Sequence, residues 1–170
     1  MLKFDHHKSM AKINVLFQPI IEDIDKIEKC SKDFLVELDL GNFKEDVITQ
    51  LTENIFELED MYDELMDALS TILQDIPLES RTAKEALSAL EKVKDIFEDV
   101  RLRIDNLKGF IKPDITHNNT LLQEVIKDVN KSIIELKSAL TNDVSKHVKS
   151  IMNEYMKFES FLSSDAEIER

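Results

Sequence analysis

Apolar residues recur at alternating intervals of three and four along most of this chain. Such spacing places side chains on one face of an α-helix and is typical of helices that pack against one another in a bundle. In the first run the alternation is interrupted only by Ser31, and its apolar members are Met10, Ile13, Phe17, Ile20, Ile24, Ile27, Phe34 and Leu38. The pattern predicts an all-α fold.

Four further runs follow, separated by segments that end helices. The second run is Ile48, Leu51, Ile55, Leu58, Tyr62, Leu65, Leu69 and Ile72. The third is Ala86, Leu90, Val93, Phe97, Val100, Ile104 and Leu107. The fourth is Leu122, Val125, Val129, Ile133, Leu136 and Leu140, and the fifth is Val144, Val148, Ile151, Tyr155, Phe158 and Leu162.

The breaks between the runs set the predicted helix bounds. Gly41, Pro77 and Gly109 stop the first three helices, and a short turn at Thr141, Asn142 and Asp143 separates the last two. We therefore expect helices at about 9–38, 43–74, 79–109, 118–140 and 143–163, with fraying after Ser163. Pro19 leaves two alternatives for the first helix: a start near Gln18 with the proline in the first turn, or an earlier segment that bends there.

With 170 residues the chain has the length of one domain, and only two glycines and three prolines leave room for few, short turns. Short links make neighbouring helices antiparallel, so we expect an elongated bundle of about five long helices. Three helices precede the longest loop, at about 110–118, and a helical hairpin follows it. The second part looks like an incomplete copy of the first, which suggests that another chain covers some apolar surface in a homo-oligomer.

The net charge of −13 and the lack of long apolar stretches exclude nucleic acid as a partner and a membrane-spanning segment. A nucleic-acid backbone would repel this chain. The N-terminal run from Leu2 to His7 is too polar for a signal peptide, and no apolar stretch is long enough to span a bilayer. These features predict a cytoplasmic protein. Its only cysteine, Cys30, cannot form an internal disulfide and is interpreted as a small buried apolar residue.

The sequence carries no recognisable set of catalytic residues. A ferritin-like di-iron site needs Glu-x-x-His pairs on two helices, and none of the four histidines supplies one. A phosphate-binding glycine loop, a nucleophile elbow and a Cys-x-x-Cys pair are also missing. We therefore expect neither an enzyme nor an organic cofactor.

Carboxylate pairs four residues apart are the remaining candidates for chemistry, because they lie one above the other on a helix and can share a hard cation. Glu59 lies on the flank of its apolar stripe, whereas Asp95 points away from its own. Most such pairs in so acidic a chain are solvated surface. They are Glu53/Glu57, Glu59/Asp63, Asp60/Glu64, Asp63/Asp67, Glu91/Asp95, Asp95/Asp99 and Glu124/Asp128.

Two segments carry a resemblance to a known family. Residues 57–65 read ELEDMYDEL and residues 89–100, after Pro77, read ALEKVKDIFEDV. They resemble the E-L-E-x-x-x-D-E-(I/L) and S-L-D-x-I-A-D-x-I-E-D-A segments of PhoU-like proteins, in the branch encoded beside Pit-type phosphate permeases. The resemblance covers the first three helices and, more loosely, 121–140. It implies a PhoU-like or spectrin-like three-helix unit followed by the hairpin.

The resemblance also implies a metal site and a partner. Its ligands would be carboxylates from two neighbouring helices, and oxygen ligands suit Mg, Ca, Mn or iron; the residues are Glu59, Asp63, Glu91, Asp95, Glu98 and Asp99. The implied partner is a Pit-type phosphate permease at the membrane surface.

The chain departs from the family pattern in two places. Glu154 is followed by Phe158 where the second motif would need Asp, and a sixth helix is missing. Ser80 also stands where the family has arginine, with Arg81 one position later.

Three functional hypotheses therefore stand at the level of sequence. The first is a PhoU-like accessory protein of phosphate transport that binds metal and a permease. The second is a non-catalytic helical scaffold or oligomerisation module whose carboxylates only solubilise it. The third is an enzyme with a carboxylate-bridged metal centre, which would need an inward polar pocket that the apolar stripes do not leave.

Overall fold

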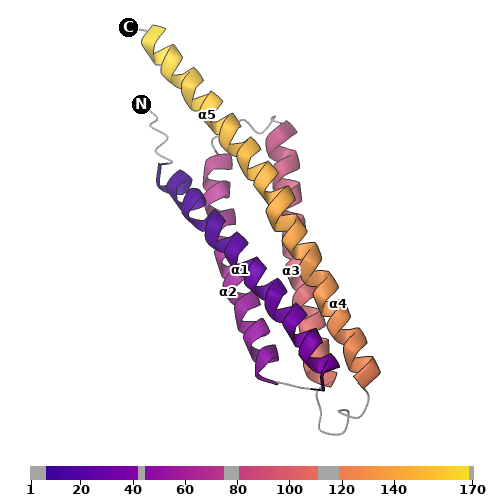
Figure 1. The fold of residues 1–170 in the computed structure, drawn as a ribbon. Helices are drawn as coiled ribbons and strands as arrows, with labels where there is room; N and C mark the ends of the chain where they lie inside the picture. Colours follow the sequence, from indigo (N-terminus) through magenta and orange to yellow (C-terminus); the bar gives the residue numbers. More distant parts are fainter. Residues whose placement is uncertain (1–6, 42–44, 75–80, 111–118, 169–170) are drawn as a thin grey trace.

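The computed structural model describes residues 7–41, 45–74, 81–110 and 119–168, and it confirms an all-α helical bundle. Its elements are α1 (His7–Asp39), α2 (Asp46–Leu73), α3 (Arg81–Phe110), α4 (Asn119–Ser138), a π-helical segment η1 (Ala139–Val144) and α5 (Ser145–Ile168). The helices form an elongated bundle (Figure 1).

Four rods make up the bundle, and each packs against two neighbours. Helix α1 lies beside α2, α2 beside α3, α3 beside α4, and α4 beside α1. Cross-helix contacts show that neighbours run antiparallel: Asp25 and Asp39 of α1 contact Lys137 and Gln123 of α4, in reverse order along the chain. The predicted antiparallel packing is confirmed for this pair of helices, and Figure 1 shows the same alternation around the bundle.

The predicted apolar stripes form the core. Ile24, Leu58 and Val100 are fully buried, as are most members of the first three runs. One register detail on α4 differs from the prediction: Val125 is only half-buried and Ile126 takes the core position. Ile126 and Val129 are three residues apart, so they follow the buried Leu122 in the same alternation as the other helices.

The predicted turn at Thr141, Asn142 and Asp143 is wrong, because α4 continues into α5 without a break. The two helices form one long rod through η1, so they make no hairpin (Figure 1). Leu136, Leu140, Val144 and Val148 are all buried at three consecutive intervals of four. In a regular α-helix of 3.6 residues per turn, side chains spaced four apart drift around the helix and would leave the core face. The π-helical turn holds more residues per turn, so it keeps this run facing the core. Burial of the run therefore outweighs the turn preference of Asn142 and Asp143.

Helices α1 and α5 are longer than the sequence predicts. Helix α1 is one element from His7 to Asp39 with Pro19 inside it. It closes at Gly41, whose φ of 81° is a conformation that glycine adopts without strain. Helix α5 continues to Ile168, past the predicted end at 163, because each residue added to an existing helix gains a backbone hydrogen bond. Its last turns project past the other helices (Figure 1).

Within the described ranges, none of the helices is both long enough and apolar enough to traverse a bilayer. The predicted loop at about 110–118, with His117, lies almost entirely outside the described residues, as do Glu79 and Ser80 before α3.

Candidate functional site

Glu59 on α2 lies against two basic side chains of α3. Its Oε1 atom is 3.5 Å from Lys94 Nζ and 3.4 Å from Arg101 Nη1. Lys94 also donates a hydrogen bond of 2.5 Å to Oδ1 of Asp63. Both α2 carboxylates of the predicted metal site are therefore paired with cations from the neighbouring helix.

The register of the helices explains why these side chains meet. Glu59 follows the buried Leu58, while Lys94 and Arg101 follow the buried Val93 and Val100. A residue next to a core position lies on the flank of the helix, and flanks of antiparallel neighbours face each other. The heptad spacing of Lys94, Arg101 and Lys108 is the sequence signal for this basic flank, and the carboxylate pattern alone did not reveal it.

Glu59 is the most enclosed carboxylate of this cluster. Its side chain is 12% exposed, against 37% for Lys94 and 38% for Arg101. Both bases approach the same oxygen, Oε1. The other oxygen, Oε2, and the Nε atom of Arg101 are buried and have no hydrogen-bond partner among the described residues.

An aromatic contact packs beneath this cluster. Tyr62 is fully buried, lies 5.4 Å from the ring of Phe97, and donates a hydrogen bond of 2.5 Å to the backbone carbonyl of Leu90. Burial, with a smaller contribution from the charge of Asp63, raises the pKa of Tyr62. Tyr62 is therefore a neutral hydrogen-bond donor that fixes α2 to α3.

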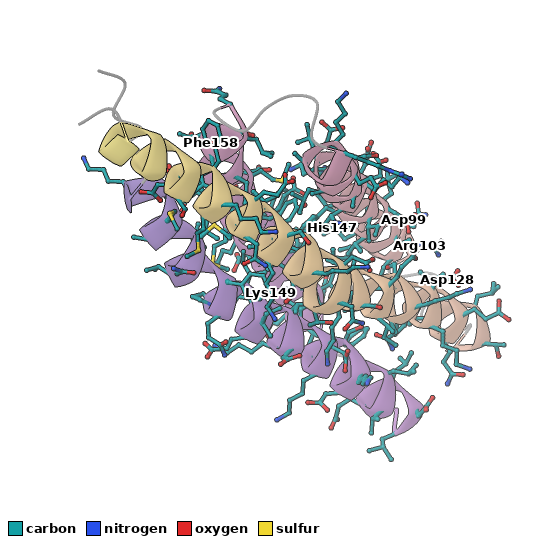
Figure 2. All side chains as sticks on the ribbon, turned by 90° about the horizontal axis from the view of Figure 1, so that it is seen from above. Asp99, Arg103, Asp128, His147, Lys149 and Phe158 are labelled. Carbon is teal, nitrogen blue, oxygen red and sulfur yellow. The ribbon has the colours of Figure 1, made fainter. Side chains whose placement is uncertain are left out.

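The other four predicted ligands lie elsewhere on α3. Glu91, Asp95 and Glu98 are exposed, which confirms that Asp95 points outward. Asp99 accepts a hydrogen bond of 3.0 Å from Nε of Arg103, whose Nη1 lies 3.9 Å from Asp128 on α4 (Figure 2). Asp99 thus belongs to the contact of α3 with α4, away from Glu59.

The predicted ligands are therefore divided between two helix contacts and the outer face of α3. Among the residues that the structure describes, no three His, Cys, Asp or Glu side chains are grouped to hold a metal ion. The proposed metal site at these six residues stays a prediction.

A second cluster of ion pairs joins α1 to α4. Lys137 Nζ lies 3.0 Å from Asp25 and 3.2 Å from Glu28. Glu28 also accepts a hydrogen bond of 2.9 Å from Lys32 Nζ. The hydrogen bond from Lys32, opposed by burial and supported by Lys137, lowers the pKa of Glu28. The pKa of Lys137 is raised by its hydrogen bonds to Asp25 and Glu28. Among the described residues, ion pairs thus join α2 to α3, α1 to α4 and, through Arg103 and Asp128, α3 to α4.

Cys30, the only thiol, is half-buried on α1. Burial raises its pKa, with a smaller effect from Asp33, so the reactive thiolate form is disfavoured.

Comparisons of the chain with family models, with curated proteins and with solved structures found no match.

Proposed function

We propose that this protein is a non-catalytic helical interaction module of the cytoplasm, in which the flank carboxylates fix the helices to one another. The observation that supports this most directly is the pairing of Glu59 with Lys94 and Arg101. The same use of carboxylates recurs where Lys137 joins Asp25 and Glu28.

Electrostatics favours this structural role for Glu59 over metal binding. A metal ion at Glu59 would lie close to two positive side chains that already share its Oε1 atom. At the effective dielectric near a protein surface, like unit charges 4 Å apart repel by about 4 kcal/mol. A metal would therefore have to displace Lys94 and Arg101 or overcome that repulsion.

A second candidate function is the PhoU-like accessory role in phosphate transport, with metal at Glu59 and its neighbours and a permease as partner. One observation favours it beyond the sequence resemblance: Glu59 Oε2 is buried without a partner among the described residues. Cytoplasmic loops of membrane proteins carry an excess of Lys and Arg, which suits so acidic a protein.

The experiment that separates the two functions is metal analysis combined with thermal unfolding. Protein purified without a tag or chelator is analysed for bound elements, and its melting temperature is then measured with and without Mn²⁺, Fe²⁺ or Zn²⁺. The matched variants are Glu59→Gln and Glu57→Gln, because Glu57 is exposed on the same helix.

The interaction module predicts protein without stoichiometric metal and a lower melting temperature for Glu59→Gln alone. Stoichiometric metal in the wild type, lost in Glu59→Gln and kept in Glu57→Gln, would overturn it in favour of the metal-binding function.

A further inference from the structure

Helix α2 has an unusual charge distribution for a helix in a bundle. Between Asp46 and Leu73 it contains no Lys, Arg or His, so all of its charged residues are acidic. We call the five exposed ones on its outer face the acidic stripe. They follow one another at intervals of three and four, and they are Glu53, Glu57, Asp60, Glu64 and Asp67.

The acidic stripe has no compensating charge in the described structure. None of its members forms an ion pair with another described residue, unlike Glu59 and Asp63 on the inner flank. Carboxylates three or four residues apart on one helix repel each other and cost a few tenths of a kcal/mol per pair. A bound positive surface would relieve this repulsion.

An apolar groove adjoins the acidic stripe. It lies between α2 and α3, encloses about 310 Å³, and is lined at its rims by Phe56 and Leu102, which are 51% and 57% exposed. On α2, Phe56 lies one turn from Glu53 and one turn from Asp60. Phe56 therefore borders the groove beside the stripe, and Leu102 borders it from α3.

The two rims of the groove differ in charge. The α3 rim carries Glu98 and Asp105 together with Arg101 and Lys108, so its charges balance. The α2 rim is formed by Thr52, Ile55 and Phe56 and carries no charge, and the charged residues of α2 beyond this rim are all acidic. An occupant with one apolar face and one basic face would thus be held in a single orientation, with its cations over α2.

From this juxtaposition we propose that the groove and the acidic stripe together bind a Lys- and Arg-rich amphipathic helix of a partner protein. Its apolar side chains lie between Phe56 and Leu102, and its cations pair with the acidic stripe. Nucleic acids and anionic lipid surfaces carry the wrong charge for this surface. The inference rests on the proposed interaction function and names the chemistry of the partner.

The test uses the full chain and a synthetic probe. The probe is a fluorescent helical peptide of about three heptads with Leu at the a and d positions and Lys elsewhere. A second peptide has Glu in place of Lys. Binding is measured by fluorescence anisotropy, at low salt and again at about tenfold higher salt, where screening weakens exposed ion pairs.

Two charge-matched variants identify the surface. The stripe variant carries Glu53→Gln, Glu57→Gln, Asp60→Asn and Glu64→Gln. The control carries Asp33→Asn, Glu124→Gln, Glu135→Gln and Asp143→Asn, which removes the same charge from exposed positions on other helices. A third variant, Phe56→Ser, tests the apolar rim, and circular dichroism checks that each variant folds.

We expect the Lys peptide to bind, the Glu peptide not to bind, and the stripe variant to weaken binding at least about tenfold more than the control. Phe56→Ser should weaken binding as well, and high salt should weaken it for the wild type. Equal losses in the two charge variants, equal binding of the two peptides, or no binding at all would overturn the proposed surface. None of these outcomes depends on the metal analysis that tests the proposed function. The peptide-binding proposal and the proposed function can therefore fail separately.

Discussion

The phenolic hydroxyl of Tyr62 on α2 donates a hydrogen bond to the backbone carbonyl of Leu90 on α3, within the buried core of the contact between these helices. Tyr62→Phe removes this hydrogen bond and leaves the ring packed on Phe97. We expect the free energy of unfolding to fall by about 1 kcal/mol, measured by urea denaturation. An unchanged value would show that the hydroxyl contributes nothing to the contact.

The same residue predicts the alkaline limit of stability. Because the pKa of Tyr62 is raised in the folded state, the unfolded chain loses this proton first as the pH rises. The contribution of Tyr62 is therefore complete below pH of about 10, the ordinary tyrosine pKa, and is lost above it. Tyr62→Phe should show a smaller loss of stability between neutral and alkaline pH than the wild type.

The core of the bundle could be predicted from the sequence, because burial imposes a period that apolar residues must follow. Ile24, Leu58 and Val100 were placed in the core by spacing alone, and all are buried. Even Ser31, which interrupts the first run, occupies a core position with 1% exposure. Periodicity identifies the buried face of each helix with little dependence on its neighbours.

Features that depend on neighbouring helices were not predictable in this way. Spacing placed Glu59 on a flank, but only the antiparallel register of α2 and α3 shows that Lys94 and Arg101 face it. Similarly, Asn142 and Asp143 favour a turn locally, while burial of Leu140 and Val144 keeps the helix continuous. These outcomes are set by tertiary packing.

Pro19 inside α1 predicts a stabilising substitution. Proline has no backbone N–H and clashes with the preceding turn, which costs a helix interior up to about 3 kcal/mol relative to alanine. Pro19→Ala should raise the free energy of unfolding by about 1–3 kcal/mol in urea denaturation. Asn14→Ala, at an exposed position of the same helix, is the control and should gain only a few tenths. Equal gains in both variants would contradict an uninterrupted helix through Pro19.

Ser31 predicts a second stabilising substitution in the core. The pairs of Asp25 with Lys137 and of Asp39 with Gln123 place Ser31 at the level of Asn130 and Ser132 on α4. The hydroxyl of Ser31 is buried and has no hydrogen-bond partner in the described part of the chain, whereas that of Ser132 donates to the carbonyl of Val129. Ser31→Ala should therefore stabilise the protein by about 1 kcal/mol, since it removes an unpaired buried hydroxyl.

Ser132→Ala is the matched control for that substitution, because it removes a hydroxyl that has a partner. Its unfolding free energy, from the same denaturation series, should rise less or fall. A gain as large as that of Ser31→Ala would mean that the missing partner of Ser31 has no energetic effect.

Glu28 predicts how the protein responds to acid. Its pKa is held below the ordinary value of 4.5, chiefly by the hydrogen bond from Lys32 and also by Lys137. Stability from this group is therefore present above pH 4.5 and is lost as the pH falls through the lowered pKa. Glu28→Gln should flatten the acid side of a melting temperature profile against pH, and a profile with the wild-type slope would contradict this role of Glu28.

The pairing of Glu59 with Arg101 is the central claim, and a double-mutant cycle tests it most directly. Unfolding free energies are measured for the wild type, Glu59→Gln, Arg101→Gln and the double variant, in metal-free buffer. We predict a favourable coupling of about 0.5–1.5 kcal/mol, since Glu59 is largely enclosed and Arg101 is partly exposed. A cycle between Glu57 and Arg101 should give none. A coupling near zero would contradict the account. If added Mn²⁺ also stabilised Arg101→Gln more than the wild type, Glu59 would instead be a metal ligand.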